Sequence, residues 1–459
     1  FRRGVVGEIA HRLGRPLCPR PAGGPHEPMA GPVAHTVEHL FRGDPAPVWT
    51  AMADTVRYNE AAGLPRHRIE EVVQPDGTIR FVGRGRIGPF ELEWDDLPPN
   101  WVKERWFEHR RRFALGPFRR VDARFGLEPM PSGCRGRYTL EVEPATVAGR
   151  LLLNTGFFPG AERMFRKLAL DADAFALGER RRPFEVAPPK LAEGGAGRLA
   201  RLAAELDATP YAHGLAGRLA ELLRSAPDTD VQRVRPLVLA RQWGVPATAT
   251  IELCLQATRL GLLELRWDLL CPRCRVAKVS SPGLDRLPTG AHCGTCNIDY
   301  GRDFARNVEL SFRPAGAIRG IEAGEFCLLG PMSQPHVWAH VTLGPGEERG
   351  LDDVPPPGPY RLRTLEAGPE TEIEHDGGSF PSVVVTDDGV GAEAPGPAGS
   401  VTLRNASAHR RTVVIESRAW AKDALTADRV ATLQAFRDLF SDEVLRPGTR
   451  LTPGALGVL

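Results

Sequence analysis

Four cysteines in two pairs have the residue type and the spacing of a metal site. Cys271 and Cys274 form one Cys-x-x-Cys pair, and Cys293 and Cys296 form a second pair eighteen residues further on. Two such pairs separated by about 15 to 20 residues are typical of a zinc site. Four thiolates complete a tetrahedron around Zn²⁺ and leave no open position for a substrate. The sequence therefore predicts a structural zinc ion held by these four cysteines.

A single Cys-x-x-Cys pair would also fit a redox dithiol, because this motif lowers the pKa of one thiol. A second pair at zinc-site spacing favours the metal. The other cysteines are scattered and show no paired spacing: Cys18, Cys134, Cys254 and Cys327. Free thiols beside a thiolate metal site fit a reducing compartment, so we expect a cytoplasmic protein.

The composition is that of an ordinary soluble protein. The chain has 459 residues, of which 42% are hydrophobic and 25% charged, with a net charge of +2. This length indicates several domains. The small net charge provides no general attraction to nucleic acid, which we regard as an unlikely partner. No run of about 18 apolar residues is present, so we expect no membrane span.

Residues 33–178 show the order strand, helix, antiparallel meander and long closing helix. The opening strand is expected at His35 to Phe41, and the closing helix over Gly160 to Leu177, where apolar residues recur at helical spacing. This order and the stretch PAPVWTAMADTVRYNEAAGL resemble the START-like, polyketide-cyclase-like helix-grip family. The resemblance implies a curved sheet that wraps a long helix, and an apolar cavity for a small hydrophobic ligand.

Arginines and aromatic side chains interleave between Trp101 and Arg124, including the run Arg110-Arg111-Arg112. Such interleaving occurs on surfaces that bind nucleic acid or acidic partners. Alternating strands produce the same pattern, because they bury aromatics on one face and expose charges on the other. We expect the second explanation here, since nearby acidic residues dilute the positive field.

The region between residues 197 and 267 is helical and leads by a strand into Cys271. Its pattern of helix, short turn, helix and strand resembles a winged-helix unit. The second helix of the pair, ATATIELCLQATRL, is nearly all apolar or small. A DNA-recognition helix needs hydrogen-bond donors and cations, so we expect this helix to pack against protein. A DNA-binding regulator remains an alternative function.

Short apolar stretches separated by Gly and Pro fill residues 308–418 and predict a small β-sandwich. Within it, His336, Trp338 and His340 would share one strand face. A final helix is expected over residues 425–446. Its apolar stripe can pack on its own domain or form a homodimer with a second copy, and consists of Val430, Leu433, Phe436, Phe440 and Val444.

The order of segments from ARQWG, through LGLLELRWDLLCPRC and LPTGAHCGTCNIDYGRDF, to LQAFRDLFSDEVLRPG carries a further resemblance. It resembles the uncharacterised region that precedes the catalytic domain in a group of bacterial class III adenylate/guanylate cyclases. The resemblance implies a regulatory or sensory region, with signal transduction through a cyclic nucleotide. The catalytic domain would lie outside this chain, and no catalytic residue can be assigned within it.

Enzymatic motifs such as G-x-S-x-G, the Walker loop and H-E-x-x-H are absent from the sequence. A cyclase or hydrolase acting on a small molecule in the helix-grip cavity remains an alternative. It would need an ionisable pair facing that cavity, such as His67 with a glutamate of the meander.

The predicted fold class is a multidomain α+β protein. It has a START-like helix-grip domain, a winged-helix-like helical unit with a four-cysteine zinc ribbon, a small β-sandwich and a C-terminal helix. The expected boundaries are 1–30 for a disordered arm, 33–178 for the helix-grip domain, 182–195 for a linker, 197–267 for the helical unit, 268–304 for the zinc ribbon, 308–418 for the sandwich and 425–446 for the output helix.

Overall fold

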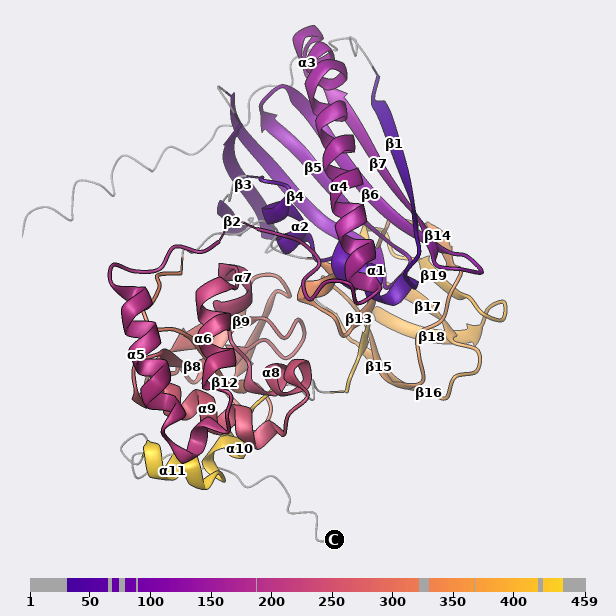
Figure 1. Ribbon diagram of the computed structural model, residues 1–459. Helices are drawn as coiled ribbons and strands as arrows, with labels where there is room; N and C mark the ends of the chain where they lie inside the picture. The colour runs from indigo at the N-terminus through magenta and orange to yellow at the C-terminus, as the bar shows by residue number, and fades with distance from the viewer. Residues whose placement is uncertain are drawn as a thin grey trace, which may run out of the picture.

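The chain is described by a computed structural model over residues 31–64, 68–73, 79–87, 90–186, 188–321, 330–366, 368–419 and 424–440. The expected disordered arm at residues 1–30 lies outside these residues. Figure 1 shows a large sheet with a long helix across it, a second group of strands behind it, and a mainly helical unit below. Among the described helices, none combines the length and apolar character needed to cross a membrane.

The large sheet begins with seven antiparallel strands. They are β1 (Val33–Phe41), β7 (Cys134–Pro144), β6 (Phe118–Pro129), β5 (Trp106–Leu115), β4 (Phe90–Val102), β3 (Ile79–Ile87) and β2 (Arg68–Val73), in spatial order. α1 (Pro45–Met52) and α2 (Thr55–Ala61) connect β1 to β2. The strand, helices, meander and closing helix thus follow the order that the sequence indicates.

Helix α4 (Phe158–Ala176) covers one face of this sheet, which we call the inner face (Figure 1). It follows α3 (Val147–Leu152) and a π-helical turn (Leu153–Phe157). Phe165 of α4 is fully buried, and its ring stacks on Tyr138 of β7 at 5.2 Å between centroids and contacts Phe125 of β6 at 6.2 Å. Apolar side chains at helical spacing therefore fix α4 on the sheet.

A buried carboxylate ties the end of β1 to α4. Asp173 is 4% exposed. It accepts hydrogen bonds from the backbone N–H groups of Arg42 at 2.8 Å and Gly43 at 3.0 Å, and from Arg42 Nε at 2.8 Å. Burial alone would raise the pKa of Asp173. The hydrogen bonds outweigh burial and hold this pKa below its usual value, and the bond from the Arg42 side chain contributes most among them.

Asp173→Asn is expected to lower the free energy of unfolding by about 1 to 3 kcal/mol at neutral pH, because charge-assisted hydrogen bonds to buried backbone are lost. A lowered folded-state pKa gives stability that is present above the unfolded value of about 3.9 and is lost as pH falls through the folded value. Urea unfolding over the acidic range should therefore show a shallower pH dependence in the variant. Glu179→Gln, which removes an exposed partner of the same Arg42, is the control. An equal effect of both variants would contradict this assignment.

The large sheet does not end at β4. β4 pairs along one edge with β3 at residues 90–95 and, further on, with β13 (Val337–Leu343) at Trp101 and Val102. β20 (Arg411–Ser417), β15 (Gly358–Thr364) and β16 (Thr371–His375) continue the sheet from β13, giving eleven strands among the described residues. β4 is thus a branch point that belongs to two parts of the molecule.

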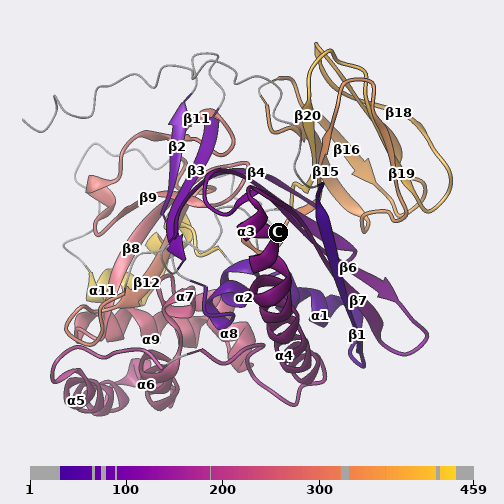
Figure 2. The ribbon, with the colours of Figure 1, turned by 90° about the horizontal axis from the view of Figure 1, so that it is seen from above.

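A second sheet packs on β13, β20 and β15. It contains β14 (Glu348–Leu351), β19 (Val401–Asn405), β17 (Pro381–Thr386) and β18 (Gly389–Pro395). The two layers, called the sandwich below, enclose a buried core that includes Leu362, Phe380 and Val413. Figure 2 shows the sandwich on the side of the large sheet opposite α4.

The predicted fold class is wrong at the β-sandwich. The sandwich is not a separate small domain, because one of its layers is continuous with the first sheet through β4 and β13. In addition, β12 (Val308–Pro314), which we assigned to it, pairs with β8 (Leu263–Leu270) instead. Strand pairing over this sequence distance leaves no local signal, so period-two alternation alone could not reveal it.

The prediction of a winged-helix unit is also wrong. α8 (Pro236–Trp243) and α9 (Ala247–Arg259) form the expected helix pair, but Ile251, Leu253 and Leu255 of α9 are buried. α9 packs with β8 and other helices in the core of the helical unit, as expected from its apolar sequence, and Thr248 and Arg259 lie on its exposed side. Other helices of this unit are α5 (Gly195–Asp207), α6 (Ala216–Ser225) and α7 (Asp228–Val231).

The prediction of a single C-terminal helix is wrong as well. Two short helices, α10 (Ala427–Ala431) and α11 (Gln434–Leu439), replace it, and Leu433 between them is extended. Val430 is fully buried and Phe436 contacts Trp267 of β8 at 6.1 Å, so both stripe residues pack into the helical unit. The break lets both side chains reach one core. Residues 441–446 of the expected helix lie outside the described residues.

Candidate functional site

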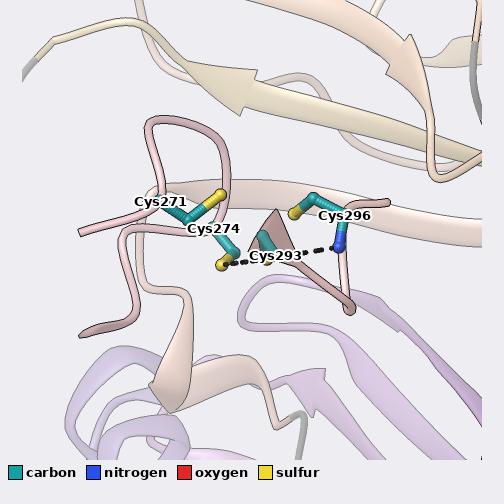
Figure 3. A group of neighbouring side chains, drawn as sticks. All are labelled: Cys271, Cys274, Cys293 and Cys296. Carbon is teal, nitrogen blue, oxygen red and sulfur yellow. Dashed lines mark hydrogen bonds between the residues drawn. The ribbon is translucent and has the colours of Figure 1, made fainter. Parts of the chain in front are cut away.

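The four cysteines come from two turns. Cys271 and Cys274 lie between β8 and β9 (Ala277–Ser281). Cys293 ends β10 (Gly290–Cys293), and Cys296 lies in the turn to β11 (Ile298–Gly301). The β10–β11 hairpin pairs Cys293 with Ile298 and carries the second turn back toward the first. Figure 3 shows the four side chains grouped with their sulfurs turned toward a common space.

The geometry of this cluster matches a metal site. All four sulfurs lie within 4.8 Å of one another, and each residue is at most 1% exposed. The cysteines are free thiols, with Cys274 Sγ and Cys293 Sγ 3.7 Å apart. A tetrahedral zinc ion with Zn–S bonds of about 2.3 Å requires sulfurs about 3.8 Å apart. Four buried cysteines this close together can bind a metal ion.

The backbone of both turns has the same shape. The residue after each second cysteine is left-handed: Arg275 has φ +58° and Asn297 has φ +47°. A left-handed residue reverses the chain tightly, and for arginine that backbone conformation is costly. The turns are held by hydrogen bonds from Arg275 N to Cys271 O at 2.8 Å and from Cys296 N to Cys293 Sγ at 3.4 Å. The Cys-x-x-Cys spacing thus places both sulfurs of each pair on one side.

One cation, Lys278, lies beside the cysteine cluster. Lys278 Nζ donates to Thr295 Oγ1 at 3.1 Å beside the cluster. Burial alone would lower the pKa of Lys278, but the negative charges of Cys293 and Cys274 raise it above its usual value. Hydrogen bonds from the thiol of Cys271, and from those of Cys274 and Cys296, lower the pKa of Cys293. Hydrogen bonding with Cys271 raises the pKa values of Cys274 and Cys296, so without a metal the cluster contains sulfurs that ionise readily and sulfurs that keep their protons. Metal binding requires the ionised form.

The first cysteine turn is fastened to the sandwich. His336 Nε2 donates to Arg273 O at 2.8 Å, and Arg275 Nη2 donates to Ser417 O at 2.8 Å. Arg273 also pairs with Glu370 at 3.3 Å. The cysteine cluster thus lies at the junction of the helical unit and the sandwich. His292 and Asp299 pair with each other at 2.9 Å near the second turn, where both are exposed.

The side chains of His336, Trp338 and His340, which alternate along the chain, do not meet in a common site. His340 is buried, stacks on Trp101 at 4.4 Å and donates from Nδ1 to Pro99 O at 2.7 Å. Burial lowers the pKa of His340 to about 3, so it is neutral at physiological pH. Trp338 is buried in the sandwich core, while His336 holds the cysteine turn. These residues serve packing and fastening.

The inner face of the sheet carries ionisable residues that sequence analysis did not single out. The strand register places Trp94, Asp96, His109, Arg111 and Tyr138 on the face that α4 covers. Arg111 Nε donates to Asp96 at 3.3 Å, and its guanidinium lies 5.4 Å from the Trp94 ring centre. Period-two alternation around Phe107 would have indicated His109 and Arg111. His67, the histidine we named, lies outside the described residues.

These ionisable groups are surrounded by apolar protein but remain partly accessible to solvent. His109, Arg111 and Tyr138 are each only partly buried, so part of their surface on the inner face remains accessible. Burial by surrounding protein lowers the pKa of His109 to about 4 and raises that of Tyr138 to about 12. Both are therefore neutral at physiological pH. Gly83 leaves room for the Trp94 indole, which a Cβ there would contact at 2.2 Å.

Three cavities lie elsewhere. The largest of the three, about 930 Å³, is on the outer face of the sheet. A second, about 470 Å³, lies where the helical unit, the cysteine turn and the sandwich meet. A third, about 250 Å³, lies beside α1 and is lined by Trp49 and Trp101. None of these three is lined by a residue of α4.

A model of a protein family of unknown function, DUF5939, matches residues 205–333, which is less than a third of the 459 residues. This segment contains most of the helical unit and the whole cysteine cluster. The match gives no activity, because the family itself has none assigned. No curated protein matches the chain.

Solved structures similar to this chain include the protein Mll3558 from Rhizobium loti, at 21% identity and a TM-score of 0.24, covering 30% of this chain and 96% of that protein. The aromatase/cyclase di-domain StfQ of the steffimycin pathway has 11% identity and a TM-score of 0.24, covering 32% and 52%. The ZhuI aromatase/cyclase from Streptomyces sp. R1128 has 16% identity and a TM-score of 0.20, covering 32% and 92%. Each similarity covers about a third of the chain.

Proposed function

We propose that this chain is a regulatory region in which a structural zinc ion fixes the helical unit to the sheets, and the inner face of the first sheet takes a small, mainly apolar ligand. The catalytic domain that it would regulate lies outside the chain and is of the class III adenylate/guanylate cyclase type. The sequence resemblance around the cysteine pairs supports this context. The proposed domain limits are those given above, apart from the corrections to the sandwich and the final helix.

One observation carries the proposal: β4 belongs to both the ligand face and the sandwich. Its inner-face residues Trp94 and Asp96 lie on one half, and Trp101 and Val102 pair with β13 on the other. β13 is preceded by His336, which holds the turn of Cys271 and Cys274 through the carbonyl of Arg273. A ligand that changes the twist of β4 would therefore act on a strand that is hydrogen-bonded, through His336, to the first cysteine turn.

The chemistry of the inner face suits an apolar ligand with one or two polar groups. The rings of Trp94 and Phe113 lie 5.8 Å apart and provide apolar surface. Arg111, with its partner Asp96, provides charge, and neutral His109 and Tyr138 provide hydrogen-bonding groups. Ligand sites in proteins typically combine mainly apolar walls with a few fixed polar groups.

The test uses the neutral apolar dye N-phenyl-1-naphthylamine and the whole chain. We expect saturable fluorescence enhancement that Trp94→Ala weakens about tenfold, since an aromatic contact contributes roughly 1 to 1.5 kcal/mol. Trp106→Ala is the matched control, because Trp106 lies on the adjacent strand β5 and faces the opposite side. Thermal unfolding of both variants shows whether they remain folded.

Bound dye should also slow amide exchange in β13 and β20. Absence of saturable binding, or equal loss in the two tryptophan variants, would reject the ligand face. Binding that leaves amide exchange in β13 and β20 unchanged would reject the coupling through β4. The zinc part of the proposal is tested separately by metal content.

A further inference from the structure

A polar groove lies on the outer face of the sheet, away from α4 and the cysteine cluster. Its volume is about 930 Å³, within the range of about 300 to 1,000 Å³ in which small-molecule ligands bind. Outward side chains of β4 to β7 form its floor, and residues 342–353 of the sandwich and Arg410 form its rim. Seven arginines and five acidic residues line it, so its walls are strongly polar.

Four of these arginines have carboxylate partners. The pairs are Arg105 with Asp353, Arg135 with Glu128, Arg137 with Glu38 and Arg349 with Glu347. These pairs neutralise the groove's edges and hold its walls together. The other three arginines of the groove, Arg110, Arg124 and Arg410, have no carboxylate partner at comparably short distance among the described residues.

The three remaining arginines come from three elements and line the same groove. The nearest acidic oxygen to Arg110 Nε in an ion pair belongs to Glu108, at 3.9 Å, and Arg110 Nε has no hydrogen-bond partner among the described residues. Arg124 lies over the Trp106 ring at 4.6 Å, and neither it nor the exposed Arg410 forms an ion pair within the described part of the chain. These guanidinium groups can therefore accept an outside anion.

Electrostatics favour such an anion. Burial lowers the pKa of Arg110, and although Glu108 and Asp122 raise it, the charges of Arg112 and Arg410 lower it again. A net lowering means that the positive charge of Arg110 is under-compensated in the folded protein. An anion bound between Arg110 and Arg410 would relieve their mutual repulsion.

We propose that this groove binds a small phosphorylated molecule that also carries hydroxyl groups, such as a sugar phosphate or a nucleotide. Guanidinium groups present paired N–H donors that match phosphate oxygens. The carboxylates of Glu108 and Asp352, which share the lining, can accept hydrogen bonds from hydroxyl groups. An apolar ligand would leave all these groups without partners, which distinguishes this groove from the inner face.

Calorimetric titration of the whole chain with AMP, ribose 5-phosphate and inorganic phosphate tests the proposal. We expect one saturable site for AMP or ribose 5-phosphate, bound more tightly than inorganic phosphate. The double variant Arg124→Gln/Arg410→Gln is expected to weaken affinity at least about tenfold, because each lost charge-assisted hydrogen bond contributes more than a neutral one. Its thermal stability should be retained, since neither side chain forms an ion pair in the described structure.

The matched control is Arg166→Gln/Arg201→Gln, which removes the same charge from exposed positions on α4 and α5. It should leave affinity unchanged. Equal weakening in both double variants would reduce the effect to net charge and overturn the site. Failure of all three phosphates to saturate overturns it too. Citrate or adenosine binding as tightly as AMP would overturn the assignment to a phosphorylated ligand.

Discussion

Replacing Cys274 with serine is expected to remove bound zinc and to unfold the β10–β11 hairpin together with the turn between β8 and β9. Within the described part of the chain the cluster consists of these four cysteines, whose sulfurs are buried and lie within 4.8 Å of one another, so no further ligand is at hand to replace a lost one. Zinc binding is folding free energy in such sites, on the order of 10 kcal/mol in small zinc peptides. The surrounding core will absorb part of this loss, so we expect a large fall in melting temperature with the helical unit partly retained.

Zinc stoichiometry by mass spectrometry, thermal unfolding and amide exchange over residues 271–301 measure this effect. Cys254→Ser is the control, because Cys254 is equally buried but lies on α9 outside the cluster. It should keep one zinc per chain. A wild-type protein purified without chelator that contains no zinc, or a Cys274→Ser variant that keeps a full equivalent, would refute the metal site.

Arg363→Met is expected to cost about 3 to 5 kcal/mol of unfolding free energy, because it removes the closest cation from a buried carboxylate. The remaining partners of Glu416 are Arg361 at 3.3 Å and His336 at 3.8 Å. Arg363 and Glu416 are each 2% exposed, and Arg363 Nη2 donates to Glu416 Oε2 at 2.8 Å. Denaturant unfolding measures the loss. The double variant Arg363→Met/Glu416→Leu should recover most of it, because no unpaired charge then remains.

The pH dependence of the unfolding free energy of Arg363→Met distinguishes the loss of charge pairing from the loss of packing. Burial alone would raise the pKa of Glu416, but Arg363 lowers it, so the wild-type carboxylate contributes stability that is lost as pH falls through the folded value. In Arg363→Met the folded pKa should rise above the unfolded one, so the penalty should shrink on acidification. Arg404→Met removes an exposed partner of Glu393 and should cost less than about 1 kcal/mol. A penalty for Arg363→Met that is independent of pH would indicate lost packing instead.

The sequence was sufficient for features that local spacing determines. The cysteine turns need only two residues between ligands and one left-handed residue after them, and the intervening hairpin is short. Helix α4 repeats its apolar residues at helical spacing, so Phe165 and Leu168 could be expected to face the sheet. Such features require no knowledge of distant segments.

Features that distant segments determine were not predictable. The pairing of Val102 with Ala339 joins residues more than two hundred positions apart, and nothing near either residue indicates the other. The apolar sequence of α9 indicates that it packs against protein, but not that its partners are β8 and α11. The break at Leu433 likewise results from the core that Val430 and Phe436 both enter. The inner-face position of His109 depends on the register of β5 with β6.

The branch at β4 also determines how this protein can be divided. A fragment ending near residue 186 would contain β1 to α4 but would lack β13, so the backbone of Trp101 and Val102 would lose its partner strand. Both side chains are buried in the whole chain and would become exposed at a sheet edge. Unpaired, apolar strand edges promote aggregation. The first sheet and the sandwich should therefore be produced, unfolded and degraded as one cooperative unit.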